Sequence, residues 1–302
     1  MTGTKILIKA KTRFNYIYVL QHGDIREMWF KGDNEYFLQS RINITQPNSL
    51  IMVYSHLMMA SLLIKPQPKH VLVIGLGGGL FPKFLNSHYP ESIIDIVEVD
   101  RKVIELSKQF FFFKETQNCR VYVQDGRVFV RERLGKTTYD MVFLDAFKSG
   151  SVPFHLKTIE FYEEILHSLT PDGVVASNLY GKSNTLKPHD LQTFGKVFKQ
   201  IYLFEDPEEV ATALIATNEV RRKSAQDFVV AAEELMVSGI CILPAKSIAA
   251  AYQENELRDQ PGFVFKDDFT RDKFLKSVEK NNLNNFVPRP YAIMNTNPED
   301  SK

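Results

Sequence analysis

One strand-to-helix turn in this chain reads VLVIGLGGGL, from Val71 to Leu80. Its first four residues are apolar with no polar alternation, which predicts a strand buried on both faces, as in a parallel sheet. Glycine follows because a tight turn from strand to helix needs positive φ angles and a close approach of the backbone. A helix that opens at Phe81 would aim the free backbone N–H groups of its first turn at a ligand above the sheet.

The spacing of the glycines separates two classes of ligand. A dinucleotide fingerprint has glycine at the first, third and sixth positions, which here are Gly75, Gly77 and Leu80. Because the sixth position is leucine, the dinucleotide fingerprint is incomplete. The pattern that is left, Gly-x-Gly-x-Gly, is usual for S-adenosylmethionine-type nucleosides, which have no pyrophosphate. A second buried strand over 93–97 is followed by Glu98, whose carboxylate can accept hydrogen bonds from a ribose diol. The glycine loop and Glu98 together predict a nucleoside site. The alternative interpretation of the loop is a plain tight turn, and that of Glu98 is a solvated strand end.

The composition narrows the class of protein. The chain has 302 residues, of which 44% are hydrophobic and 24% charged, as in soluble globular proteins. Lys and Arg number 37 against 36 Asp and Glu, which gives no overall reason to expect nucleic acid or an anionic membrane. Two cysteines, Cys119 and Cys241, are too few for a disulfide framework or a zinc cluster. We therefore expect a reduced cytoplasmic compartment and no metal, without a signal peptide or membrane span.

The chain divides into three predicted parts. Residues 1–49 predict a small N-terminal β-hairpin domain, and residues 50–220 a main domain that opens with an amphipathic helix. Strands and helices alternate in the main domain, which predicts a doubly wound α/β parallel sheet with right-handed crossovers. Residues 221–302 predict a C-terminal helical extension with a polar tail, partly disordered from residue 281.

The individual elements follow from the same patterns. Strands are predicted at 5–10, 16–20, 25–30, 71–74, 93–97, 121–123, 139–144 and 174–177, with a further helix and two strands within 191–204 and 210–217. Helices are predicted at 50–63, 81–86, 101–112, 126–134, 158–169, 225–237 and 245–252, and a turn at 170–173. The acidic pair Asp267-Asp268 is interpreted as a solvated turn.

Together these pieces resemble the spermidine/spermine synthase family, the polyamine aminopropyltransferases, over about residues 5–220. The parts that carry the resemblance are the β-hairpin lead-in, the stretch 71–80, VEVDRKVIELSKQFF (97–111), VQDGRVFV (123–130) and YDMVFLDAF (139–147). The Gly-Leu-Gly-Gly-Gly loop is similar to that of the spermidine-synthase-like branch. The resemblance implies an N-terminal β-domain, a Rossmann-like domain of the class I S-adenosylmethionine-binding type, and often a homodimer.

The resemblance also implies roles for residues at matching positions. Glu98 would bind the ribose hydroxyls, and Asp125 would accept from the adenine amino group, with Gly126 allowing a close approach. Asp125 has a second interpretation as the cap of the helix that follows it. The loop glycines that would surround the nucleoside are Gly75, Gly77, Gly78 and Gly79.

Asp145 matches the family's catalytic aspartate. It follows the strand 139–144 at the carboxyl end of the sheet, where open α/β sheets bind ligands. Tyr54, His155 and Lys148 are candidates for substrate binding. Their plainer interpretations are a core-facing tyrosine for Tyr54 and a surface loop histidine for His155.

Two positions depart from the family pattern. The family loop reads Gly-Gly-Gly-Asp-Gly-Gly, and its aspartate, which holds the free amine of the aminopropyl group, is replaced by Gly78. The family motif Asp-x-x-Asp-Pro reads Asp145-Ala146-Phe147-Lys148-Ser149 here, with a cation in place of the second acid. A polyamine is a cation whose pocket should be acidic, so both departures run against a standard polyamine enzyme.

The sequence therefore predicts a spermidine-synthase-like transferase. Its co-substrate would be S-adenosylmethionine or the decarboxylated form, without a metal, and its acceptor a small molecule, a polyamine if the family activity is kept. One alternative is a methyltransferase that uses the same nucleoside site on an unknown acceptor. The other is a non-catalytic binding module with the same fold.

Overall fold

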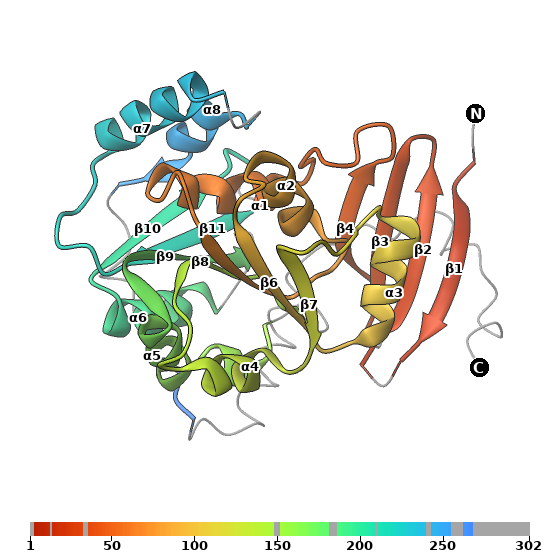
Figure 1. Cartoon of the computed structure of the whole chain (residues 1–302), viewed down its shortest axis with the longest axis horizontal. Helices are drawn as coiled ribbons and strands as arrows, with labels where there is room; N and C mark the ends of the chain where they lie inside the picture. The colour runs from red at the N-terminus through yellow and green to blue at the C-terminus, as the bar shows by residue number, and fades with distance from the viewer. Residues whose placement is uncertain are drawn as a thin grey trace.

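A computed structural model shows the chain as two β-sheets with helices packed around them (Figure 1). The structure describes residues 3–12, 14–32, 36–147, 152–180, 186–208, 211–239, 243–254 and 262–267. Cys241, Lys148 and the tail from residue 281 lie outside these residues. None of the described helices is long and apolar enough to cross a membrane.

The N-terminal sheet is antiparallel, in the order β1-β2-β3-β4. Its strands are β1 (Lys5–Lys11), β2 (Tyr16–His22), β3 (Ile25–Lys31) and β4 (Tyr36–Asn43). The first three were predicted and are confirmed. The fourth was missed because a bulge interrupts its alternation: Met28 pairs with Ser40 and Trp29 with Leu38, which leaves Gln39 unpaired in the ladder.

The main sheet has the strand order β12-β10-β11-β9-β8-β5-β6-β7. Its strands are β5 (His70–Ile74), β6 (Ile93–Glu98), β7 (Cys119–Val123), β8 (Tyr139–Leu144), β9 (Leu169–Tyr180), β10 (Gln200–Glu205), β11 (Thr212–Thr217) and β12 (Tyr252–Gln253). Strands β5 to β9 pair in parallel, and β10 and β11 are antiparallel. After β5, the chain adds β6 and β7 on one side of that strand and then crosses over to add β8 on its other side. Open α/β sheets bind ligands at such a switch point, which here lies between β5 and β8.

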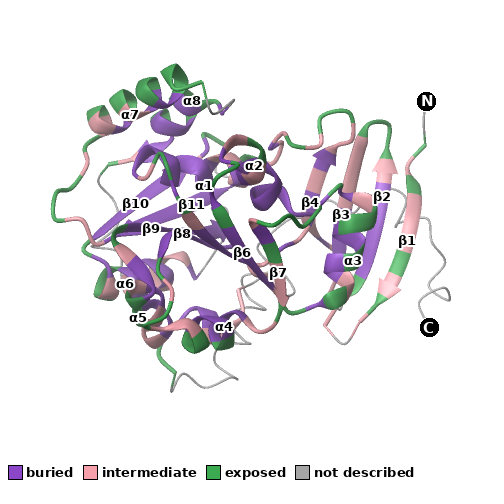
Figure 2. Cartoon of the chain, viewed as in Figure 1, coloured by how far each residue is buried: buried purple, intermediate pink, exposed green. Residues whose placement is uncertain are grey.

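Helices cover both faces of the main sheet, as the doubly wound fold class predicts. One face carries α1 (Val53–Met58), η1 (Met59–Leu63), α2 (Leu80–His88), α3 (Arg101–Phe110), α7 (Ala225–Val237) and α8 (Ala245–Ala250). The other carries α4 (Gly126–Arg133), α5 (Ile159–His167) and α6 (Lys187–Val197), with the short η2 (Phe154–Leu156) before α5. The strands between them are largely buried (Figure 2).

Three predicted elements need correction. The helix predicted over 50–63 is two short pieces, α1 and the 3₁₀ turn η1. The turn predicted at 170–173 is an irregularity inside β9, where Leu169 pairs with Tyr139 and the regular ladder resumes at Val174. The helix predicted to reach Tyr252 ends at Ala250, and the chain then pairs with β10 as β12. The domain boundaries at residues 49 and 220 stay predictions.

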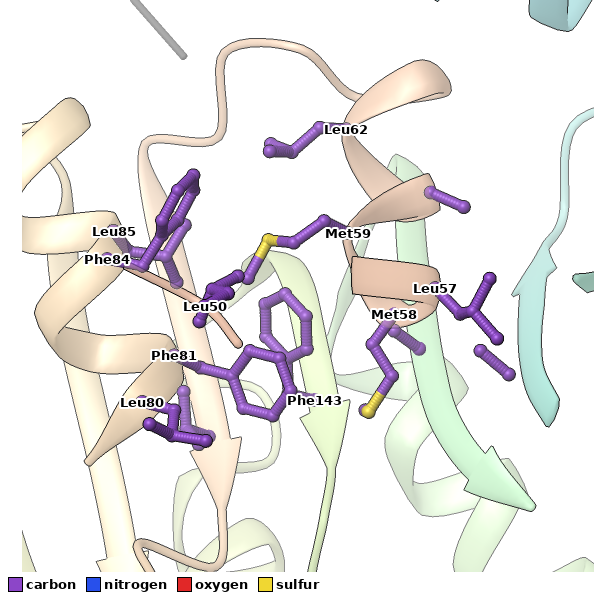
Figure 3. Packing of buried hydrophobic residues seen from close by; sticks show 14 of the residues in the cluster. Leu50, Leu57, Met58, Met59, Leu62, Leu80, Phe81, Phe84, Leu85 and Phe143 are labelled. Carbon is purple, nitrogen blue, oxygen red and sulfur yellow. The ribbon is translucent and has the colours of Figure 1, made fainter. Parts of the chain in front are cut away.

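The packing beneath the glycine turn fixes the helix that follows it. Figure 3 shows Phe81 of α2 packed against Phe143 of β8, with Met58 from α1 beside them. The two phenyl rings are stacked, with centroids 4.9 Å apart. Tyr54 meets the Phe81 ring edge-on at 6.1 Å. Because Phe143 precedes Asp145 by two residues, this packing brings α1, the glycine turn and the end of β8 together.

Candidate functional site

The glycine turn between β5 and α2 lies directly against the end of β8. Gly75 has φ +100°, and a Cβ on it would lie 2.4 Å from the backbone oxygen of Asp145. The Asp145 N–H donates to the Ile74 carbonyl at 2.9 Å. Only glycine tolerates both this left-handed backbone and this close approach. The turn and Asp145 thus share one edge of the sheet, as the sequence predicted.

Gly78 faces the N-terminal sheet. A Cβ at this position would lie 2.5 Å from Ser40 Oγ and 2.8 Å from a ring carbon of Phe111. Ser40 and Phe111 are themselves buried. A side chain at residue 78 therefore has no room without a shift of β4 or of the segment after α3.

Glu98 ends β6 and binds the glycine turn. Its carboxylate accepts from the Leu76 N–H at 3.1 Å and from the Asp100 N–H at 2.9 Å. Burial raises the pKa of Glu98 despite these bonds. A carboxylate has about four lone-pair sites, so two backbone bonds leave acceptor capacity for hydroxyl groups. The carboxylate fits the expected ribose contact, which stays a prediction.

Asp125 caps α4 and pairs with His155. Its Oδ1 accepts from the N–H groups of Arg127 and Val128, at 3.0 and 3.2 Å, which bears out the capping interpretation. Its Oδ2 lies 2.7 Å from His155 Nε2. The bond to His155 is the main reason why the pKa of Asp125 is lowered. His155 therefore lies beside the position predicted to contact adenine.

Gly126 opens α4 against the centre of the sheet. A Cβ there would lie 2.5 Å from Ile74 Cγ2, the residue before the glycine turn. The first turn of α4 consequently approaches β5 closely. Gly126, and Asp125 next to it, therefore lie close to the glycine turn.

Asp145 is held by two neutral donors. The Tyr54 hydroxyl donates to Oδ2 at 3.2 Å, and the Asn178 amide donates to Oδ1 at 3.3 Å. Burial raises the pKa of Asp145 to about 7, although both hydrogen bonds oppose that shift. Burial also raises the pKa of Tyr54 well above its usual range, so the phenol stays a donor. Such a carboxyl group can take up or release a proton near neutral pH.

Asn178 is a site residue that the sequence reasoning missed. It lies near the end of β9, next to β8 in the sheet. The rule that singled out Asp145, a polar residue at the carboxyl end of an apolar strand, applies equally to Ser177-Asn178 after Val174-Val175-Ala176. The structure brings together Gly75, Glu98, Asp125, Asp145, Tyr54 and His155, while Lys148 lies outside the described residues. No group of potential metal ligands occurs within the described part of the chain.

Comparison with known proteins adds a family match and relatives. Residues 51–218 match the family described as "Spermine/spermidine synthase domain". A polyamine aminopropyltransferase of Vibrio vulnificus is 34% identical over 212 residues, which cover 70% of this chain and 71% of that protein. The human "eEF1A lysine and N-terminal methyltransferase" is 29% identical over 168 residues, which cover 52% of this chain but only 24% of the human protein.

A solved structure supports the fold. A probable spermidine synthase from Corynebacterium glutamicum superposes with a TM-score of 0.65 at 18% identity. The superposition covers 85% of this chain and 99% of the other. It includes more of the chain than the family match does, so the shared fold extends beyond residues 51–218.

Proposed function

The chain belongs to the spermine/spermidine synthase domain family and is a transferase, and we propose that it moves an alkyl group from an S-adenosylmethionine-type nucleoside to an amine. The observation that carries this proposal is the placement of Asp145. A partly buried carboxyl group with a pKa of about 7 lies against the glycine turn, at the switch point of the sheet. In this proposal Asp145 would accept the proton that the incoming amine loses.

The nucleoside would lie across the carboxyl ends of β5, β6 and β8. Glu98 would accept from the ribose hydroxyls with the lone pairs that its two backbone bonds leave. Asp125 would meet the adenine amino group, with His155 beside it. The glycine turn would face the amino-acid end of the nucleoside. This placement of the nucleoside agrees with the positions of Glu98, Asp125 and Asp145 along one sheet edge.

The chemistry needs little beyond alignment and one proton acceptor. The amine lone pair forms a bond to the carbon next to the sulfonium, and the carbon–sulfur bond breaks with its electron pair left on sulfur. The nitrogen then sheds a proton to the Asp145 carboxylate, which Tyr54 and Asn178 hold in place. Holding the two reactants in line accounts for much of the rate in such a displacement.

Two group transfers fit this site. The Vibrio relative favours aminopropyl transfer to a polyamine. Position 78 favours methyl transfer, because it carries no carboxylate and has no room for one. A carboxylate there would attract the amine of the decarboxylated nucleoside and repel the carboxylate of S-adenosylmethionine. The human methyltransferase relative fits this second candidate. The arrangement around Asp145 speaks against the non-catalytic alternative.

Paired calorimetric titrations with the two nucleosides test the proposal. We expect S-adenosylmethionine to bind at least as tightly as its decarboxylated form, because nothing at position 78 repels its carboxylate. A clear preference for the decarboxylated nucleoside would instead make aminopropyl transfer to a polyamine the activity. Binding of neither nucleoside would overturn the proposal. Mass spectrometry of products from an amine acceptor screen then identifies the group transferred.

The assembly and location follow from the family resemblance and from the composition. We propose a homodimer that acts in the cytoplasm. Light scattering after size-exclusion chromatography checks the first, and cell fractionation checks the second.

A further inference from the structure

A short C-terminal segment, residues 262–267, returns across the outer helices of the main domain. We name it the C-terminal strap. It lies outside residues 51–218, the part of the chain that matches the family. Its Phe265 is 1% exposed, and the backbone of Phe265 accepts from the Ile159 N–H at 2.9 Å and donates to Thr193 Oγ1 at 3.0 Å. The strap is therefore docked on α5 and α6 by its own core residue.

The strap ends on a buried arginine of α4. Asp267 accepts from Arg127 through both of its oxygens, with Nη1–Oδ1 2.7 Å and Nη2–Oδ2 2.9 Å. The Thr158 hydroxyl donates to the same Oδ1 at 2.9 Å. Glu164 holds the Nε side of the guanidinium at 2.8 Å. Arg127 is 6% exposed, so two carboxylates fix a planar cation that has little contact with water.

Arg127 connects this ion pair to the candidate site. The nitrogen that binds Asp267, Nη1, also donates to the His155 carbonyl at 3.3 Å. Two residues earlier in the chain, Asp125 pairs with the His155 ring at 2.7 Å. The first turn of α4 thus holds both the backbone and the ring of His155. Of the two carboxylates on Arg127, Asp267 is the one that fixes the nitrogen in contact with His155.

We propose that Asp267 is a positioning residue for the nucleoside site: the strap fixes Arg127, and Arg127 fixes the His155–Asp125 pair. The inference rests on the proposed function, because it places this pair at the adenine end of a bound nucleoside. It extends that site to a segment beyond the family region. Asp267 itself touches no reacting group.

The first experiment needs no ligand. Asp267→Asn keeps the shape and the docking of Phe265 but removes the charge that holds Arg127 Nη1. We expect faster hydrogen–deuterium exchange over residues 154–157, by about fivefold to tenfold. Thr158 is left out of this window because its hydroxyl contacts Asp267 directly. Asp172→Asn is the matched control, because Asp172 also pairs with a cation, Lys65, on a different part of the surface. Unchanged exchange over residues 154–157 in Asp267→Asn would overturn the proposal.

A double-mutant cycle then tests the route to the nucleoside site. Asp267→Asn should weaken binding of S-adenosylmethionine by about fivefold to tenfold, a typical coupling between residues of one network. If Asp267 acts through Asp125, Asp267→Asn should add little to Asp125→Asn. Additive losses would overturn this route. If the wild type binds no nucleoside, the proposed function fails, while the exchange experiment still decides whether the strap positions His155.

Discussion

At the scale of single residues, Asp145 links the site to the stability of the protein. Its folded-state pKa of about 7 lies above its ordinary value of 3.8 because burial disfavours the charged form. Between about pH 4 and 7 the folded state keeps a proton that the unfolded chain loses. Stability must then fall as pH rises through this window. The raised pKa of Asp145 therefore lowers the stability of the protein at neutral pH.

Asp145→Asn tests this reasoning, since an amide has no proton to lose. We expect the free energy of unfolding of the variant to rise relative to that of the wild type by about 4 kcal/mol between pH 4 and 8. Urea denaturation at both pH values measures the difference. Asp172→Asn is the control, because a hydrogen bond from Lys65 lowers the pKa of Asp172 and should reverse the sign. A pH-independent difference for Asp145→Asn would show that its carboxyl group titrates as in water.

Glu98→Gln separates binding from folding at the same sheet edge. The amide keeps one acceptor oxygen for the backbone but loses the charge offered to the ribose hydroxyls. We expect nucleoside binding to weaken by about tenfold or more, since a hydrogen bond to a charged group contributes about 1.5–3 kcal/mol. The melting temperature should fall by a few degrees, because the amide nitrogen takes the place of one of the two oxygens that accept from backbone N–H groups. Calorimetry measures both, and unaltered affinity would remove Glu98 from the site.

At the scale of elements, the turn between β5 and α2 depends on one close contact. Gly75→Ala would combine a φ of +100° with a Cβ 2.4 Å from the Asp145 backbone oxygen. Gly135→Ala is the matched control, because Gly135 has φ +71° and nothing within 4 Å of its Cβ position.

We expect Gly135→Ala to lower the free energy of unfolding by about 1–2 kcal/mol, because of its left-handed backbone alone. Gly75→Ala should cost several kcal/mol more, because backbone atoms must move apart. Chemical denaturation of both variants measures the contrast. Equal losses would mean that the turn can open away from β8 at no cost.

Elements were predictable where one local pattern is enough to define them. The predicted bounds of β8, whose last four residues are an apolar run, and of helix α7 match the structure. Strand β4 was missed because its bulge breaks the alternation, and β12 because two residues carry no period. The placement of Glu98, Asp125 and Asp145 along one sheet edge could be predicted because the carboxyl ends of parallel strands share that edge.

The strap could not be predicted from local pattern. Asp267 lies in an exposed turn, as its sequence predicts, and Asp268 lies outside the described residues. What the sequence does not show is the ion pair with Arg127, because that partner lies 140 residues away. Phe265 ends the apolar run Phe263-Val264-Phe265, which is too short to define a helix or strand by its period. Contacts of this kind depend on where the chain returns in space.

At the scale of the whole molecule, the two sheets share one hydrophobic core. Phe30 of β3 and Ile42 of β4 belong to the same buried cluster as Phe81 of α2. Lys83 of α2 joins the two regions further, because its ammonium donates to the Pro47 and Phe111 carbonyls at 2.9 and 2.8 Å. Burial lowers the pKa of Lys83 to about 8. A core continuous across both sheets implies that neither sheet unfolds alone.

We therefore expect a single cooperative thermal transition, with the calorimetric and van't Hoff enthalpies equal. Phe30→Ala, in the N-terminal sheet, should lower the whole transition by several degrees, since burial of such a ring contributes about 3–5 kcal/mol. Val220→Ala is the control, because Val220 is 84% exposed. A ligand that binds only the folded state raises the transition of everything that unfolds with its site. Saturating S-adenosylmethionine should therefore raise the same single transition, in the wild type and in Phe30→Ala alike. Two resolved transitions, of which only one responds to the nucleoside, would show that the N-terminal sheet folds independently of the site.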